Sequence, residues 1–272
     1  MSRPGSGGRR VYAVLMGLGA YVIRVPAQDW APQGWTPPQQ TGEPSMRTTA
    51  DVTARNAVRT PQFWLLWTVL FCNVTAGIGI LAQASPIVQN FFTGVGPAEA
   101  AGFVSLLSLA NMAGRLVWSS TSDVIGRKPT YMIYLGVGAV LYLGVATLGR
   151  SSLLLFVLMS VVILSFYGGG FSTVPAYLKD LFGGLQVGAI HGRLLTAWSA
   201  AGIAGPLIVS GIQDLQSSRG AEGVDLYLLS LYIMVGVLVV GFLANLMVKP
   251  VDPRFHEPVA ARDDLATEGA SS

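Results

Sequence analysis

A single arginine interrupts an apolar stretch that is long enough for a bilayer-crossing helix. Arg115 lies inside the apolar segment 98–121 and precedes Asp123 by eight residues, which is about 12 Å of helix. A cation at such a depth in lipid costs on the order of 3 kcal/mol, and a guanidinium binds a carboxylate through two parallel hydrogen bonds. We therefore interpret Arg115 as an anion ligand. The alternative is a structural arginine that reaches the aqueous surface or bonds backbone carbonyls.

Arg115 belongs to a stripe of polar residues. Their spacings of three, four, four and three place them on one helix face, which we expect to point towards other helices or a water-filled cavity while apolar sides meet lipid. The members of the stripe are Ser108, Asn111, Arg115, Ser119 and Ser122.

A compact charged turn follows this helix. It contains Asp123, Gly126, Arg127 and Lys128. Gly126 permits a tight turn because glycine tolerates backbone angles that other residues avoid, and the carboxylate of Asp123 can pair with Arg127.

Other apolar segments carry polar or aromatic side chains that suit a binding cavity. Trp198 and Tyr167 are candidates for an aromatic wall, and ordinary helix packing is the alternative for each. Asn111 and Gln83 are amides inside apolar helices. Their alternative role is hydrogen bonding between helices.

Composition indicates a membrane protein that crosses the bilayer several times. The chain of 272 residues is 51% hydrophobic and 11% charged, whereas soluble domains carry about 25% charged residues. A net charge of +3 does not indicate a nucleic-acid partner. One cysteine and two distant histidines, His191 and His256, predict no metal site. With no nucleophile–base pair inside the apolar segments, we expect neither an enzyme nor a bound cofactor.

The pattern predicts an all-α, polytopic fold in four parts. Residues 1–24 form a tail and a partial transmembrane helix, 25–61 a proline-rich linker, 62–249 a six-helix bundle, and 250–272 a polar, disordered tail. The six apolar segments of the bundle lie near 62–84, 98–121, 130–149, 152–178, 187–212 and 226–248.

Basic residues in the connections predict the orientation. Most of them lie in the linker, the Asp123 turn, the 179–193 turn and the C-terminal tail, whereas the opposite connections hold Arg150 and Arg219. The positive-inside rule therefore places the first group, with the C-terminus, in the cytoplasm. We expect a cell membrane, the bacterial inner membrane in particular. The arginines before Val11 disagree, which suggests that Val11–Ile23 is the remnant of a helix whose upstream partners are missing.

Several ordered motifs resemble the major facilitator superfamily. The Asp123–Lys128 turn is similar to its Gly-x-x-x-Asp-Arg-x-Gly-Arg-Arg/Lys loop, although Ser119 replaces the first Gly and Val124 the first Arg. Four longer motifs resemble the oxalate/formate antiporter family within it: Arg59–Trp67, Asn73–Gly77, Gly168–Tyr177 and Gly188–Gly202. The resemblance implies a transporter of twelve helices in two six-helix halves, of which this chain is the C-terminal half. The N-terminal half would then be a partner, beside the lipid bilayer.

The resemblance also implies roles for particular residues. In the oxalate-transporting branch two basic side chains hold the dicarboxylate: Arg115 matches the first, and Trp198, which cannot neutralise a charge, stands at the second. One cation suits one carboxylate, so we expect a monocarboxylate-like organic anion, transported by alternating access. The Asp123–Lys128 turn would be a conformational latch between the halves. The alternative is a truncated, non-transporting fragment, or a half that needs a separately encoded N-terminal half.

Overall fold

The computed structural model describes residues 6–22, 48 and 50–257. The chain divides into two compact units, Met1–Pro44 and Ser45–Ser272, which are described separately. In the first, helix α1 spans Ser6–Val22, so the helical prediction for Val11–Ile23 is confirmed as far as Val22. Its interpretation as the remnant of a membrane span stays a prediction.

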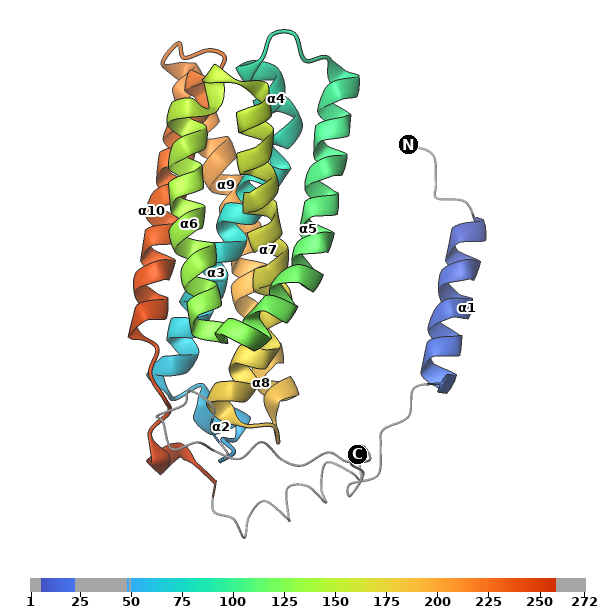
Figure 1. Cartoon of the computed structure of the whole chain (residues 1–272), viewed down its shortest axis with the longest axis vertical. Helices are drawn as coiled ribbons and strands as arrows, with labels where there is room; N and C mark the ends of the chain where they lie inside the picture. The colour runs from blue at the N-terminus through green and yellow to red at the C-terminus, as the bar shows by residue number, and fades with distance from the viewer. Residues whose placement is uncertain (1–5, 23–47, 49, 258–272) are drawn as a thin grey trace. The chain divides into compact units, whose positions relative to one another are not determined.

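The second unit is a bundle of long helices (Figure 1). Six of its helical segments are long and apolar enough to cross a membrane, and the described residues contain no strand. The predicted all-α, six-helix class is therefore confirmed. The principal helices are α3 (Pro61–Ala82), α5 (Pro97–Ile125), α6 (Arg127–Leu148), α7 (Leu153–Phe182), α9 (Thr196–Ser218) and α10 (Asp225–Met247).

Two apolar segments are broken rather than continuous. Helix α4 (Ala84–Phe91) occupies what the sequence analysis treated as a connection after residue 84. The break at Gln83 follows from Pro86, which has no N–H to donate to the carbonyl of Ala82. A shorter helix, α8 (Val187–Leu194), precedes α9 and is separated from it at Leu195.

Caps and glycines fix where the helices begin and end. The hydroxyl of Thr60 accepts a hydrogen bond from the backbone N–H of Phe63 (3.3 Å), and Pro61 occupies the first helical turn of α3, a favourable start for a helix. Gly126 connects α5 to α6 with φ +90°, a conformation that side chains disfavour. The predicted role of Gly126 in a tight turn is thus confirmed.

Helix α7 packs closely against α5. A Cβ at Gly114 would lie 2.2 Å from the carbonyl oxygen of Ser165, and one at Gly168 would lie 2.0 Å from that of Asn111. Glycines on both helices therefore allow the two backbones to touch, as is common between membrane helices.

Residues 50–60 are packed against the bundle, although the sequence analysis assigned them to the linker. They include helix α2 (Ala54–Ala57), and Val52 and Ala57 are fully buried. The backbone N–H of Thr48 donates to Asp180 (2.8 Å) and that of Val52 donates to Phe182 (2.9 Å). These bonds attach the segment to the end of α7.

Candidate functional site

Arg115 lies on α5 with an exposed side chain. It is ten residues from the end of the helix at Ile125, about 15 Å along the axis. Its guanidinium carbon lies 5.1 Å from the centre of the Phe171 ring, within cation–π range. Among the residues that the structure describes, no carboxylate forms an ion pair with Arg115. The cation is thus available to an anionic ligand.

Aromatic side chains continue from Phe171. The ring centres of Phe171 and Trp198 are 4.7 Å apart at 68°, and those of Trp198 and Tyr167 are 5.6 Å apart at 31°. The structure therefore brings the predicted residues Arg115, Trp198 and Tyr167 into one cluster. We call Tyr167, Phe171 and Trp198 the aromatic wall.

The two predicted amides differ in position. Asn111 lies one turn from Arg115 on α5 and packs against Gly168, the neighbour of Tyr167; its Oδ1 is buried and has no hydrogen-bond partner in the described part of the chain. Gln83 lies at the junction of α3 and α4. Within the described part of the chain, no hydrogen bond or ring contact joins Gln83 to Arg115 or to the aromatic wall.

The polar stripe of α5 does not line one cavity. Ser108 donates to the carbonyl of Val104 in its own helix (3.0 Å), whereas Ser119 donates to Ser172 of α7 (2.8 Å). Ser122 is buried. The stripe therefore changes from exposed side chains near Ser108 to contacts with α7 towards the end of the helix.

Phe171 is a candidate site residue that the sequence alone did not single out. It lies four residues after Tyr167 on the same helix, and residues four apart share a face of an α-helix. That spacing was the signal in the sequence, but it was concealed in a segment rich in aromatic and apolar residues.

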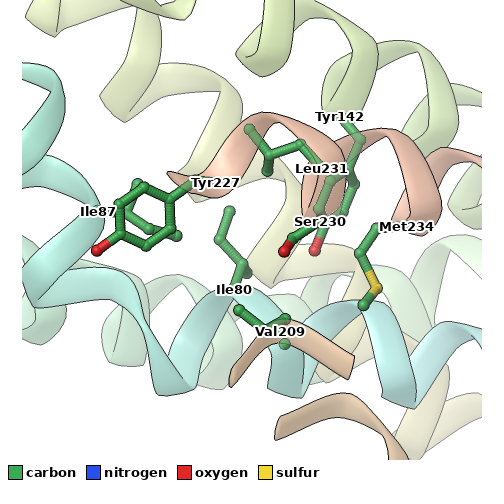
Figure 2. A pocket seen from close by; sticks show the side chains of 9 residues that line it. Ile80, Ile87, Tyr142, Val209, Tyr227, Ser230, Leu231 and Met234 are labelled. Carbon is green, nitrogen blue, oxygen red and sulfur yellow. The ribbon is translucent and has the colours of Figure 1, made fainter. Parts of the chain in front are cut away.

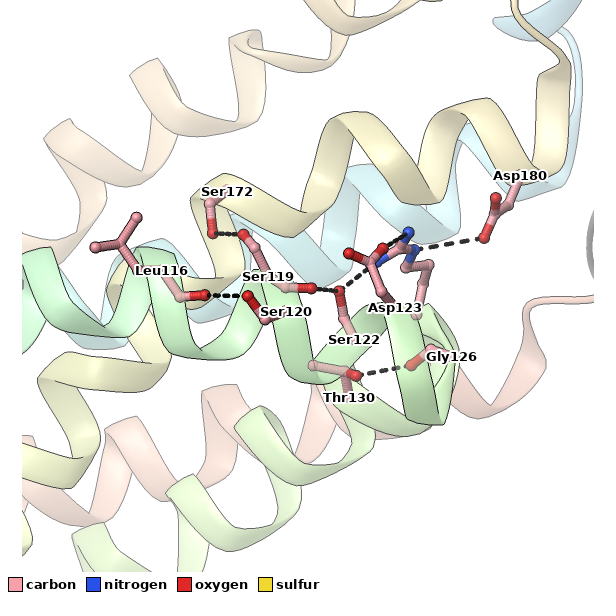
Figure 3. Close-up of polar contacts among 10 residues, drawn as sticks. Leu116, Ser119, Ser120, Ser122, Asp123, Gly126, Thr130, Ser172 and Asp180 are labelled. Atoms are coloured by element: carbon pink, nitrogen blue, oxygen red, sulfur yellow. Dashed lines mark hydrogen bonds and ion pairs between the residues drawn. The ribbon is translucent and has the colours of Figure 1, made fainter. Parts of the chain in front are cut away.

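The Asp123–Lys128 turn holds a small network of charges (Figure 3). Arg127 forms an ion pair with Asp123, donates to the hydroxyl of Ser122, and lies 3.6 Å from a carboxylate oxygen of Asp180 on α7. The predicted Asp123–Arg127 pairing is thus confirmed. The side chain of Arg127 is 11% exposed and that of Asp123 is 67% exposed, so the guanidinium is the buried centre of the network.

Lys128 points to a different element. Its ammonium donates to the carbonyls of Leu246 (2.9 Å) and Val248 (2.7 Å) at the end of α10. The amide of Asn245 in turn donates to the carbonyl of Lys128 (3.0 Å). A cation that binds the last carbonyls of a helix stabilises that helix end, so Lys128 attaches α6 to α10.

Two cavities lie apart from Arg115. The first, with an empty volume of about 240 Å³ including its opening, has an apolar lining and includes none of the predicted site residues (Figure 2). The second, with an empty volume of about 210 Å³ including its opening, is lined by Tyr167 together with Asn73 and Tyr134. Tyr167 therefore borders both this pocket and the aromatic wall.

Comparison with known proteins places the chain among transporters. The sequence profile of the Major Facilitator Superfamily matches residues 11–206 and, in a second match, 93–270. The chain is 28% identical over 195 residues to the oxalate:formate antiporter of Oxalobacter formigenes, an alignment that covers 72% of this chain and 44% of that protein. It is 27% identical over 138 residues to the uncharacterized MFS-type transporter YhjX of Escherichia coli strain K12, covering 49% of this chain and 33% of the relative.

These matches span less than half the length of either relative. They agree with the six apolar helices of the bundle and with the motifs in the Asp123–Lys128 turn. The chain is therefore a multi-pass membrane protein that belongs to the major facilitator superfamily, with similarity to its oxalate/formate antiporter members.

Proposed function

We propose that this chain is the C-terminal half of a transporter for a small, monocarboxylate-like organic anion. The observation that carries the proposal is the exposed guanidinium of Arg115, which lies within cation–π range of Phe171 and has no carboxylate partner in the described part of the chain. The chain is similar to an antiporter that is named for oxalate and formate, two anions that carry carboxylate groups. That similarity supports an anion of the same chemical class.

One charge at the site favours one carboxylate. Trp198, which matches the second basic position of the oxalate-transporting branch, belongs to the aromatic wall and supplies no cation. Arg115 would bind the carboxylate through two parallel hydrogen bonds, and the rings beside it would exclude water, which strengthens the ion pair.

Transport would proceed by alternating access, with two six-helix bundles rocking around the site. The N-terminal bundle is then a required partner, and the Asp123–Lys128 turn would act as the latch that faces the cytoplasm together with the C-terminus. Antiport in a bacterial cell membrane is the mode that the similar antiporter suggests. Asn111 would add an amide contact beside Arg115, and Gln83 would lie towards the end of the translocation path.

The test replaces Arg115 while an N-terminal half is supplied. Arg115→Lys keeps the charge but loses the planar fork, so affinity for the anion should fall about tenfold. Arg115→Gln should abolish anion uptake into liposomes without lowering the amount of protein in the membrane. Arg254→Gln is the matched control, because Arg254 also lies within cation–π range of a ring, that of Phe255 (4.8 Å), but lies outside the bundle helices.

Unchanged uptake by Arg115→Gln would make Arg115 a structural residue and remove the basis for an anion site. A second arm uses the chain alone. The chain spans 44% of the antiporter's length, which favours a half that needs a partner, so the purified chain should show no saturable uptake. Saturable uptake would instead indicate a transporter assembled from copies of this chain.

A further inference from the structure

Phe171 lies between the candidate anion ligand and the rest of the aromatic wall. Its half-buried ring has the guanidinium of Arg115 on one side, 5.1 Å from its centre, and the ring of Trp198 packed edge-on at 4.7 Å. Phe171 has no charge or hydrogen-bonding group of its own. Its effect on a ligand must therefore act through Arg115 and through its apolar surface.

Contact with Phe171 leaves N–H donors of the guanidinium available. The N–H groups of arginine lie in the guanidinium plane and point outward from its edge. The Phe171 ring, 5.1 Å from the guanidinium carbon, attracts the cation and has no oxygen or nitrogen acceptor that would occupy its N–H donors. An arginine held in this way can present its edge to a carboxylate and form two parallel hydrogen bonds.

The neighbour of Phe171 holds the backbone of the same arginine. The hydroxyl of Ser172 lies 3.1 Å from the carbonyl oxygens of both Arg115 and Gly169, which share its one proton, and it accepts a hydrogen bond from Ser119 (2.8 Å). Two consecutive residues of α7 thus contact Arg115, one at the backbone and one at the charged head. Such preorganisation reduces the cost of ordering the side chain when a ligand binds.

The surface beyond the carboxylate position is aromatic. Trp198 contacts both Phe171 and Tyr167. Phe171 and Trp198 are half-buried and present part of their rings next to Arg115, whereas Tyr167 is only 6% exposed and supports Trp198 from within the core. A flat or apolar carbon skeleton gains contact with such rings, whereas a second carboxylate would lose its hydration there without meeting a cation.

We propose that Phe171 is the positioning and specificity-determining residue of this site. It orients Arg115 for one carboxylate and, with Trp198, selects monocarboxylates that have an apolar or aromatic body. The inference rests on the proposed anion site and narrows its substrate class.

The test measures ligand binding at Arg115 without requiring transport. The full chain in lipid nanodiscs is treated with phenylglyoxal, which modifies arginine, and modification of the Arg115 peptide is followed by mass spectrometry. Benzoate, acetate and oxalate are then compared as protecting anions. Benzoate should give half-protection at a concentration about tenfold lower than acetate does, and oxalate should not protect better than acetate.

Three variants assign the effect. Phe171→Leu keeps an apolar side chain but removes the ring, so the half-protecting benzoate concentration should rise about fivefold while that of acetate changes less than about twofold. Phe171→Tyr keeps the ring and should behave like the native chain. Phe242→Leu removes a ring from α10, where it packs on Gly136, and is the matched control.

The outcomes separate the two proposals. Protection of Arg115 by all three anions at similar concentrations, or strongest protection by oxalate, overturns the selectivity assigned here and leaves Arg115 as an anion ligand. If the half-protecting concentration of benzoate is unchanged in Phe171→Leu, Phe171 does not determine specificity, and Arg115 remains an anion ligand. Absence of protection by any anion overturns the anion site and this inference with it. The comparison of anions on the native chain needs no variant, so it stands even where Phe171→Leu fails to fold.

Discussion

Helices α7 and α9 both contribute rings to the aromatic wall, yet they are held in the bundle in different ways. In the most apolar part of the α7 span, 56% of the residues are buried. The corresponding share for the span that contains α9 is 22%. Both contain an internal proline, Pro175 in α7 and Pro206 in α9. Proline content therefore does not explain the difference.

Contact between backbones explains it. Gly168 of α7 lets the backbone of α5 approach so closely that a Cβ would overlap the carbonyl of Asn111, whereas a Cβ at Gly202 of α9 would meet no atom within 4 Å. The wall on α7 is thus held by the tightest backbone contact. Helix α9 approaches a backbone less closely, at Gly205, whose Cβ would lie 3.0 Å from the carbonyl oxygen of Thr75, and is otherwise attached through side chains. One such attachment is the hydrogen bond from Trp67 Nε1 to Thr196 (3.0 Å). A ligand that bridges the two walls would meet Arg115 where α5 packs tightly on α7, and Trp198 on the less buried helix α9.

The largest expected effect comes from adding a side chain where α5 and α7 touch. Gly168→Ala places a methyl group 2.0 Å from a backbone oxygen, which a side-chain rotation cannot relieve, so the two helices must separate. We expect a loss of about 3 kcal/mol of stability, measured as a fall in the thermal unfolding midpoint of the purified chain in detergent. A midpoint equal to that of the native chain would contradict the tight packing of α5 on α7.

A smaller effect is expected from placing a positive charge on α9, the less buried of the two helices. Trp198→Lys restores a second cation, so a transporter completed with its N-terminal half should shift its preference from monocarboxylates towards dicarboxylates by about tenfold, or about 1.4 kcal/mol. Competition between acetate and oxalate for uptake measures the shift. Trp64→Lys is the control, because Trp64 is an exposed tryptophan near the start of α3 that bonds Val58. No shift in a folded Trp198→Lys variant would show that Trp198 and Arg115 face different cavities.

The smallest effect, of opposite sign, is expected at Gly202. Alanine there meets open space and restricts the unfolded chain, so Gly202→Ala should stabilise the isolated chain by about 0.5–1 kcal/mol. The same unfolding assay compares it directly with Gly168→Ala. Equal destabilisation by both alanines would remove the contrast between α7 and α9.

The fold was predictable because its signals are local. Apolar segments of sufficient length predicted the six spans, and the spacing of Asp123 and Arg127 predicted their pairing, since residues four apart on a helix are neighbours. Pro86 could likewise have predicted the break at Gln83, because a proline within a helix removes a backbone hydrogen bond.

The candidate site was less predictable because it depends on contacts between helices. Sequence spacing placed Arg115 on a polar stripe, but whether its head would meet Phe171 depended on how closely α5 and α7 pack. Lys128 illustrates the same limit. Its position beside Arg127 suggested a shared role, whereas consecutive residues of a helix point in different directions, and Lys128 reaches the end of α10.

The attachment of residues 50–60 to the bundle has a practical consequence for dividing the protein. Because Val52 and Ala57 are buried and Asp51 accepts a hydrogen bond from the backbone N–H of Leu185 (3.0 Å), this segment behaves as part of the helical bundle. Two gene fragments that meet before Thr48 would keep those contacts intact. Fragments that meet at the start of α3 would remove residues 50–60 and their contacts from the bundle. The folding unit therefore begins upstream of its first long helix.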